Sequence, residues 1–64
     1  MNTQALKELI AKKQITIDKL AEDAGVSPDV IYKTLAGKRK PTLATIGKIA
    51  SALGVEPGIL LKEE

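Results

Sequence analysis

The most constraining feature of this sequence is the way its helices begin. At three places an apolar residue precedes Ser or Thr, and a second apolar residue follows four positions after the hydroxyl. These sets are Ile15-Thr16 with Leu20, Val26-Ser27 with Ile31, and Pro41-Thr42 with Ile46. An N-cap hydroxyl binds a free backbone N–H of the first turn, and the flanking apolar pair fixes the direction in which the chain enters. Each set therefore predicts the start of a helix.

Helix ends are marked by Gly25, Gly37 and Gly54, which stand where a left-handed residue terminates a helix. With Asn2 or Thr3 as the first cap, the predicted helices span residues 3–13, 17–24, 28–36, 43–53 and 57–62. Apolar residues recur inside these spans at helical spacing. We expect a core made of Leu6, Leu9, Ile10, Leu20, Ala21, Ala24, Val26, Ile31, Leu35, Leu43, Ile46, Ile49, Ala50, Leu53, Leu60 and Leu61. The sequence thus predicts an all-α fold of five helices in a single domain over residues 1–64.

The composition excludes several classes of function. The chain has no cysteine and no histidine, so it lacks the commonest general base and the commonest metal ligands. Neither a nucleophile beside a base nor a glycine-rich phosphate loop is present, so we expect no enzyme, cofactor or metal site. No apolar run approaches the roughly 20 residues of a membrane span, and no signal peptide begins the chain. We expect a cytoplasmic protein with no membrane partner and no second, ligand-sensing domain.

The segment Thr16–Pro41, TIDKLAEDAGVSPDVIYKTLAGKRKP, predicts two short helices joined by a tight turn and followed by a basic loop. Ala21 and Gly25 are small, which we expect to let the two helices cross closely. This is the layout of a helix-turn-helix over about residues 16–36, a motif whose second helix enters the DNA major groove. Charge agrees with this interpretation: residues 30–55 contain five basic residues and no acidic one, as expected of a surface that faces phosphates.

The sequence resembles the lambda-repressor-like, or XRE/Cro-type, helix-turn-helix regulators from about Leu6 to Leu61. The segments LAEDAGVS and GKRKPTLATIGKIASALGV carry the likeness. The resemblance implies a compact five-helix domain and a Cro-like repressor or other transcriptional regulator that binds double-stranded DNA sequence-specifically. It also implies a homodimer on a two-fold-symmetric site, formed through the end of the third helix with its loop and through residues 55–61. Ile59, Leu60 and Leu61 cannot all face one small core, so one of them is a candidate contact residue.

Four positions depart from the family pattern. Many relatives have Gln where this chain has Ile17, and that amide commonly contacts a phosphate. Some relatives bury an Arg–Glu pair at the positions of Ile10 and Leu35, which are apolar here. Relatives often carry a large apolar residue in place of Thr34, so we expect lighter packing there.

The third predicted helix carries the candidates for base recognition. With Ile31 facing the core, its outward residues are Pro28, Asp29, Tyr32 and Lys33. Lys33 could donate to guanine O6 and N7, Asp29 could accept from cytosine N4, and Tyr32 could touch a thymine methyl group or a phosphate. Structural roles explain the same residues: Lys33 as a solvated lysine, Asp29 as an acid at a helix N-terminus, and Tyr32 as cover for the core.

The candidates for phosphate binding are the loop cations Lys38, Arg39 and Lys40 and the cap hydroxyls Thr16, Ser27 and Thr42. Backbone N–H groups at helix N-termini commonly contact phosphates. The hydroxyls are needed as caps in any case, and a basic turn is often merely solvated.

A second hypothesis is a protein-binding module. The segment IYKTLAGKRKP also resembles addiction-module antitoxins, in which the partner would be a toxin and DNA binding would serve autoregulation. In a stricter form the domain has lost DNA binding and binds only a toxin or a co-regulator.

Overall fold

The computed structural model describes residues 1–62, and this part of the chain forms five α-helices. They are α1 (Thr3–Lys13), α2 (Ile17–Ala24), α3 (Pro28–Leu35), α4 (Leu43–Leu53) and α5 (Pro57–Leu61). The predicted all-α fold is confirmed. Two helices end one residue early: Ala36 is the C-cap of α3, and Lys62 that of α5.

N-cap hydrogen bonds are present at four of the predicted helix starts. The side-chain oxygens of Asn2, Thr16, Ser27 and Thr42 each accept a bond from a backbone N–H in the first turn, at 3.0 to 3.3 Å. Only Glu56, at the start of α5, makes no side-chain cap bond. Four of these helices therefore begin where their own sequence satisfies the free donors of the first turn.

Helices α1 to α4 end in the same way. A left-handed residue with φ between 55° and 75° lies at each end: Gln14, Gly25 and Gly54 directly after α1, α2 and α4, and Gly37 after the Ala36 C-cap of α3. The next N–H in the chain donates back to a carbonyl in the last turn of the helix. Gln14 carries no sequence signal for this role, because only glycine adopts positive φ without steric cost.

The structure corrects the role predicted for Gly25. A Cβ atom built at this position would meet nothing within 4 Å, so the close approach of α2 and α3 does not require glycine there. Its φ of 72° is the reason for glycine. Ala21, in contrast, is buried in the core.

The core lies where α1, α2 and α4 meet the inner faces of α3 and α5. Its buried apolar residues are Leu6, Leu20, Ala21, Ala24, Ile31, Ile46, Ile49, Ala50, Leu53 and Leu60. Leu9, Ile10, Val26 and Leu35 pack around it and are partly buried. The predicted stripes are thus largely confirmed.

Two side chains predicted for the core, Leu43 and Leu61, are exposed. Leu43 is 73% exposed, because it stands in the first turn of α4, and a helical stripe is buried only where another element covers it. Leu61 is exposed together with Ile59, while Leu60 turns inward. Thr34 is only 1% exposed and belongs to the interior.

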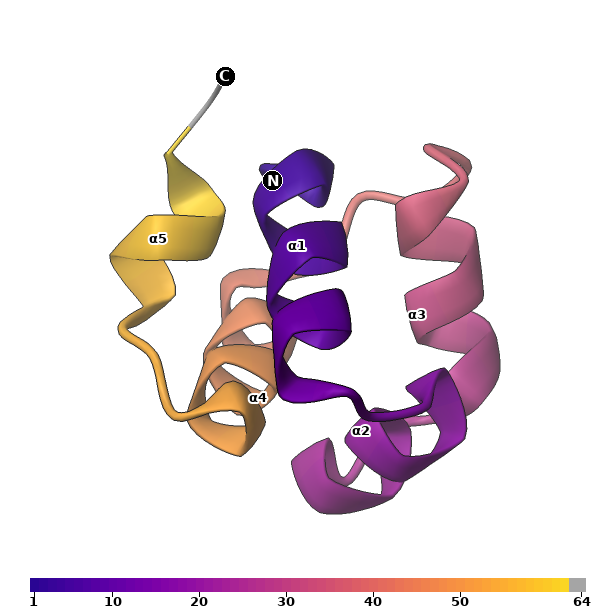
Figure 1. Cartoon of the computed structure of the whole chain (residues 1–64). Helices are drawn as coiled ribbons and strands as arrows, with labels where there is room; N and C mark the ends of the chain where they lie inside the picture. Colours follow the sequence, from indigo (N-terminus) through magenta and orange to yellow (C-terminus); the bar gives the residue numbers. More distant parts are fainter. Residues whose placement is uncertain (63–64) are drawn as a thin grey trace.

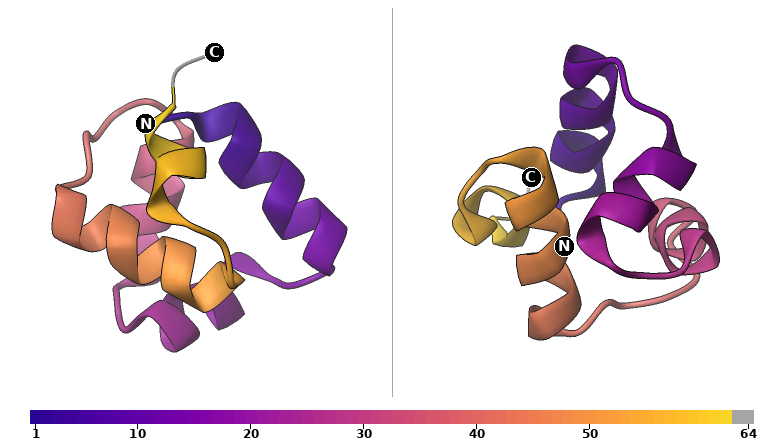
Figure 2. Two further views of the ribbon diagram at one scale, coloured as in Figure 1. Left: turned by 90° about the vertical axis from the view of Figure 1, so that its left-hand side faces the viewer. Right: turned by 90° about the horizontal axis from the view of Figure 1, so that it is seen from below.

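The arrangement of the helices leaves α3 free on one side. In Figure 1, α3 and α5 lie on opposite sides of α1, and the right-hand view of Figure 2 shows the same order. The backbone N–H of Asn2 donates to the carbonyl of Leu60 at 2.7 Å, so the start of the chain is bonded to α5. Within residues 1–62, no helix is both long and apolar enough to cross a membrane.

Candidate nucleic-acid interface

The outward face of α3 carries the four side chains predicted for base recognition. Pro28, Asp29, Tyr32 and Lys33 are all exposed, while Ile31 on the opposite face is fully buried. Eight residues of α-helix are about 12 Å long, and the major groove is roughly 12 Å wide. The exposed face of α3 therefore has the length and the polar side chains to lie in a major groove.

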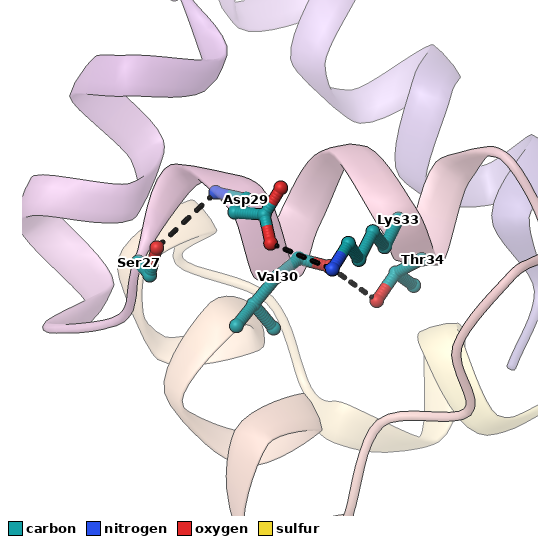
Figure 3. A network of polar contacts seen from close by, with 5 residues as sticks. All are labelled: Ser27, Asp29, Val30, Lys33 and Thr34. Atoms are coloured by element: carbon teal, nitrogen blue, oxygen red, sulfur yellow. Dashed lines mark hydrogen bonds and ion pairs between the residues drawn. The ribbon is translucent and has the colours of Figure 1, made fainter.

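Asp29 and Lys33 form an ion pair along this face. The Lys33 Nζ lies 3.0 Å from Asp29 Oδ2, and the two side chains are 53% and 66% exposed respectively. Figure 3 shows the pair across one turn of α3. This pair was not predicted, although an acid four positions before a lysine is the favourable order for an ion pair on a helix.

Two further hydrogen bonds hold this turn of α3. The Asp29 N–H donates to the Ser27 hydroxyl at 3.3 Å, and the Thr34 hydroxyl donates to the Val30 carbonyl at 2.7 Å (Figure 3). Because the Thr34 hydroxyl is hydrogen-bonded to the Val30 carbonyl, this polar residue can be buried on the inner face at little cost in free energy. The expected loss of packing at Thr34 is thus partly offset by a bond that the sequence did not indicate.

The basic loop begins at the end of α3. Gly37 turns the chain with φ 75°, and the Lys38 N–H donates to the Lys33 carbonyl at 2.9 Å. After α1, α2 and α4, the residue that follows the left-handed position is apolar and packs on the core: Ile15, Val26 and Val55. At the corresponding position after α3 the residue is Lys38, which is exposed. The loop therefore leaves α3 toward solvent instead of returning to the core.

The cations of this loop are available to a ligand. Lys38, Arg39 and Lys40 are all exposed. Among residues 1–62 the ion pairs are Lys19–Asp23 and Lys33–Asp29, so the loop cations take part in neither. Arg39 and Lys40 also line a pocket of about 200 Å³, together with Met1, Thr3, Thr34, Gly37 and Pro41. This pocket, between the start of the chain and the loop, was not predicted.

The cap hydroxyls could serve two roles at once. Thr16 and Ser27 are exposed and use their oxygens as acceptors from backbone N–H groups. A hydroxyl has two lone pairs and one donor, so it can accept the cap bond and still donate to a phosphate. Thr42 shares a hydrogen bond with the Thr45 hydroxyl at 3.0 Å, in which either atom can be the donor.

The position where relatives carry Gln is not part of this exposed surface. Ile17 is partly buried and packs against the core at the start of α2. An aliphatic side chain cannot hydrogen-bond a phosphate, so any backbone contact at this end of α2 falls to N–H groups and the Thr16 hydroxyl.

Comparison with known proteins agrees with this description. A family model described as a Cro/C1-type helix-turn-helix DNA-binding domain matches residues 5–63. A solved structure, the restriction-modification controller protein C.AhdI from Aeromonas hydrophila, superposes with a TM-score of 0.86 at 33% identity, covering 91% of this chain and 88% of that one.

Two curated proteins are also similar in sequence. The HTH-type transcriptional regulator PrtR of Pseudomonas aeruginosa is 44% identical over 52 residues, which are 81% of this chain and 20% of PrtR. An uncharacterized protein of Haemophilus influenzae is 40% identical over 40 residues, which are 62% of this chain and 41% of that protein. The chain thus spans less than half the length of either curated relative.

Proposed function

The chain belongs to the family of Cro/C1-type helix-turn-helix DNA-binding domains, the DNA-binding part of transcriptional regulators, and from this premise we propose that it binds an operator of two-fold symmetry as a homodimer. The observation that carries the proposal is the exposed face of α3 beside a loop of three cations that make no ion pair within residues 1–62. One surface thus offers both a helix for the groove and charges for the backbone.

Base recognition is assigned to the outward residues of α3. Lys33 donates to guanine, Asp29 accepts from cytosine, and Tyr32 and Pro28 meet the apolar edge of the bases or the sugar. Their exposure on one helix face supports this assignment, because residues that face away from the core are the ones that can reach base edges.

Phosphate binding is assigned to Lys38, Arg39 and Lys40 and to the hydroxyls of Thr16, Ser27 and Thr42. The loop follows α3 directly, so the cations would lie against the sugar-phosphate backbone that borders the groove. These contacts carry no sequence information, but they set the register of the protein on the duplex and dominate its affinity.

The dimer is assigned to α5 and the adjoining residues. Ile59 and Leu61 are 47% and 42% exposed on a helix that lies across α1 from α3. Two subunits joined there would leave both α3 helices free for half-sites about one helical turn, or roughly 34 Å, apart.

Selection of bound sequences from a random duplex pool tests the whole proposal. A palindrome with a fixed half-site spacing is the expected result, because it would report duplex recognition and two-fold symmetry together. A selected site without symmetry would exclude the homodimer, and failure to retain any duplex at low salt would exclude DNA binding. Sedimentation at several concentrations gives the oligomeric state independently.

A further inference from the structure

The Asp29–Lys33 pair places a donor and an acceptor side by side on the face of α3 assigned to the groove. The Nζ and Oδ2 atoms are 3.0 Å apart, and more than half of each side chain remains exposed. An ammonium group has three donors and an ionised carboxylate has about four lone-pair sites, so one mutual bond leaves both groups free to bind something else. We propose that Asp29 and Lys33 act as one unit that recognises a single G·C base pair in one orientation, an inference that rests on the proposed function.

The spacing of the pair matches the major-groove edge of a G·C pair. Guanine O6 and cytosine N4 are joined by a Watson–Crick hydrogen bond, so they lie about 2.9 Å apart. Guanine presents the acceptors N7 and O6, and cytosine presents the donor N4–H. The two remaining donors of Lys33 can meet N7 and O6 while Asp29 accepts the free N4 hydrogen, without breaking the ion pair.

The same geometry disfavours the other base pairs. Reversing the pair to C·G puts the carboxylate opposite guanine acceptors and the ammonium opposite a donor. A T·A pair keeps an acceptor and a donor in the right order, but it places the thymine methyl group on the lysine side and adenine N7, an acceptor, on the carboxylate side. An A·T pair reverses the order again. Only one of the four base pairs satisfies both charges.

The charge of Asp29 strengthens the discrimination. Asp29 is in the first turn of α3, where a helix N-terminus would otherwise attract a phosphate. Its carboxylate repels the backbone and holds the Lys33 ammonium, so Lys33 contributes little to binding at random sequence. Asp29 therefore lowers affinity for non-cognate DNA and restores it where cytosine N4 is present.

The decisive measurement compares the affinities of Asp29→Asn and the wild-type chain for the selected operator. It also uses a set of duplexes in which each half-site position is changed in turn to each of the other three base pairs. Wild type should prefer G·C at one position by about 10- to 100-fold. Asp29→Asn should lose most of that preference. It should also bind random duplex more tightly, because Lys33 is released to a phosphate. The slope of log affinity against log salt for random duplex should then steepen by about 0.9 per subunit.

The chain offers a matched control in the other ion pair. Lys19 and Asp23 have the same i,i+4 spacing on α2, at 3.4 Å and with similar exposure. Asp23→Asn removes the same charge from an exposed helical pair and should leave the preference at every position unchanged. Loss of the G·C preference in Asp23→Asn as well would attribute the effect to net charge and overturn the inference.

A change on the DNA tests the same bond with the protein intact. N4-methylcytosine keeps its Watson–Crick pair but replaces the free N4 hydrogen, so wild type should bind that operator about as weakly as a mismatched one. Asp29→Ala, whose side chain has no acceptor, should be indifferent to the methyl group. If both proteins respond alike, or if Asp29→Asn keeps full selectivity while still binding duplex, the inference is wrong and the proposed function stands. If wild type binds no duplex at low salt, both fail.

Discussion

Arg39→Ala should weaken binding to every duplex by the same factor, because in the proposed complex this loop cation contacts a phosphate and no base. Arg39 is exposed and makes no ion pair within residues 1–62, so its removal frees no buried group and should not affect folding. The change tests whether the loop supplies affinity without specificity.

The size of the effect follows from counterion release. Each phosphate neutralised contributes about 0.9 to the slope of log affinity against log salt. If Arg39 acts only in this way, its loss costs about eightfold per subunit at roughly 0.1 M salt, and about 60-fold for a dimer that makes the contact twice. At about 0.4 M salt the dimer loses only about fivefold, so the curves of the two proteins converge as salt rises.

Fluorescence polarisation on the selected operator and on a random duplex, each over a range of salt, measures both quantities. Lys7→Ala serves as the control, because Lys7 is an exposed cation on α1 that takes no part in either ion pair and lies outside the surfaces proposed to bind DNA or the second subunit, so its loss should change the slope little. The reasoning is refuted if Arg39→Ala reduces affinity for the operator but not for the random duplex, or leaves both slopes unchanged.

Other expected outcomes concern specificity, stability and assembly. Lys33→Ala should abolish about a tenfold preference at one half-site position and leave the remaining positions intact; a uniform loss of affinity in the same selection would assign Lys33 to phosphate instead. Gln14→Gly should raise the free energy of unfolding in urea by up to about 1 kcal/mol, because Gln14 has φ 55° and glycine has no steric strain there. Ala11→Gly, inside α1, should lower it, and equal effects of the two changes would contradict the explanation. Leu20→Ala should cost about 2–5 kcal/mol, since Leu20 is fully buried, and a loss below about 1 kcal/mol would mean that the crossing of α2 and α4 tolerates the cavity. Ile59→Ser should weaken self-association in sedimentation without changing monomer stability much, and an unchanged association constant would move the dimer contact away from α5.

The local elements of the fold were predictable because their signals are local. The cap bonds of Thr16 and Thr42 are made to N–H groups within the next turn, so these caps can be predicted from neighbouring residues alone. Gly25 and Gly54 mark helix ends for a similar reason, since a positive φ is a property of one residue. The positions of the helices follow from such short-range rules.

The candidate site was predictable only in part. The sequence identified which residues of α3 face outward, because Ile31 and the staple at Val26 fix the inward side. The ion pair between Asp29 and Lys33 was not predicted, although their spacing allows it. The pocket in which Arg39 and Lys40 lie beside Met1 and Thr3 was not predicted either. Contacts between segments far apart in the chain depend on how the helices pack, which no local pattern specifies.

The helices, most of their caps, their inward stripes and the concentration of positive charge after α3 were predictable from the sequence, because each depends on residues within a turn or two. The exposure of Leu43, the burial of Thr34, the bond from Asn2 to Leu60 and the open face of α3 and its basic loop arise from the packing of the helices. A side chain is buried when another element lies over it, and that depends on the packing of all five helices of residues 1–62 together.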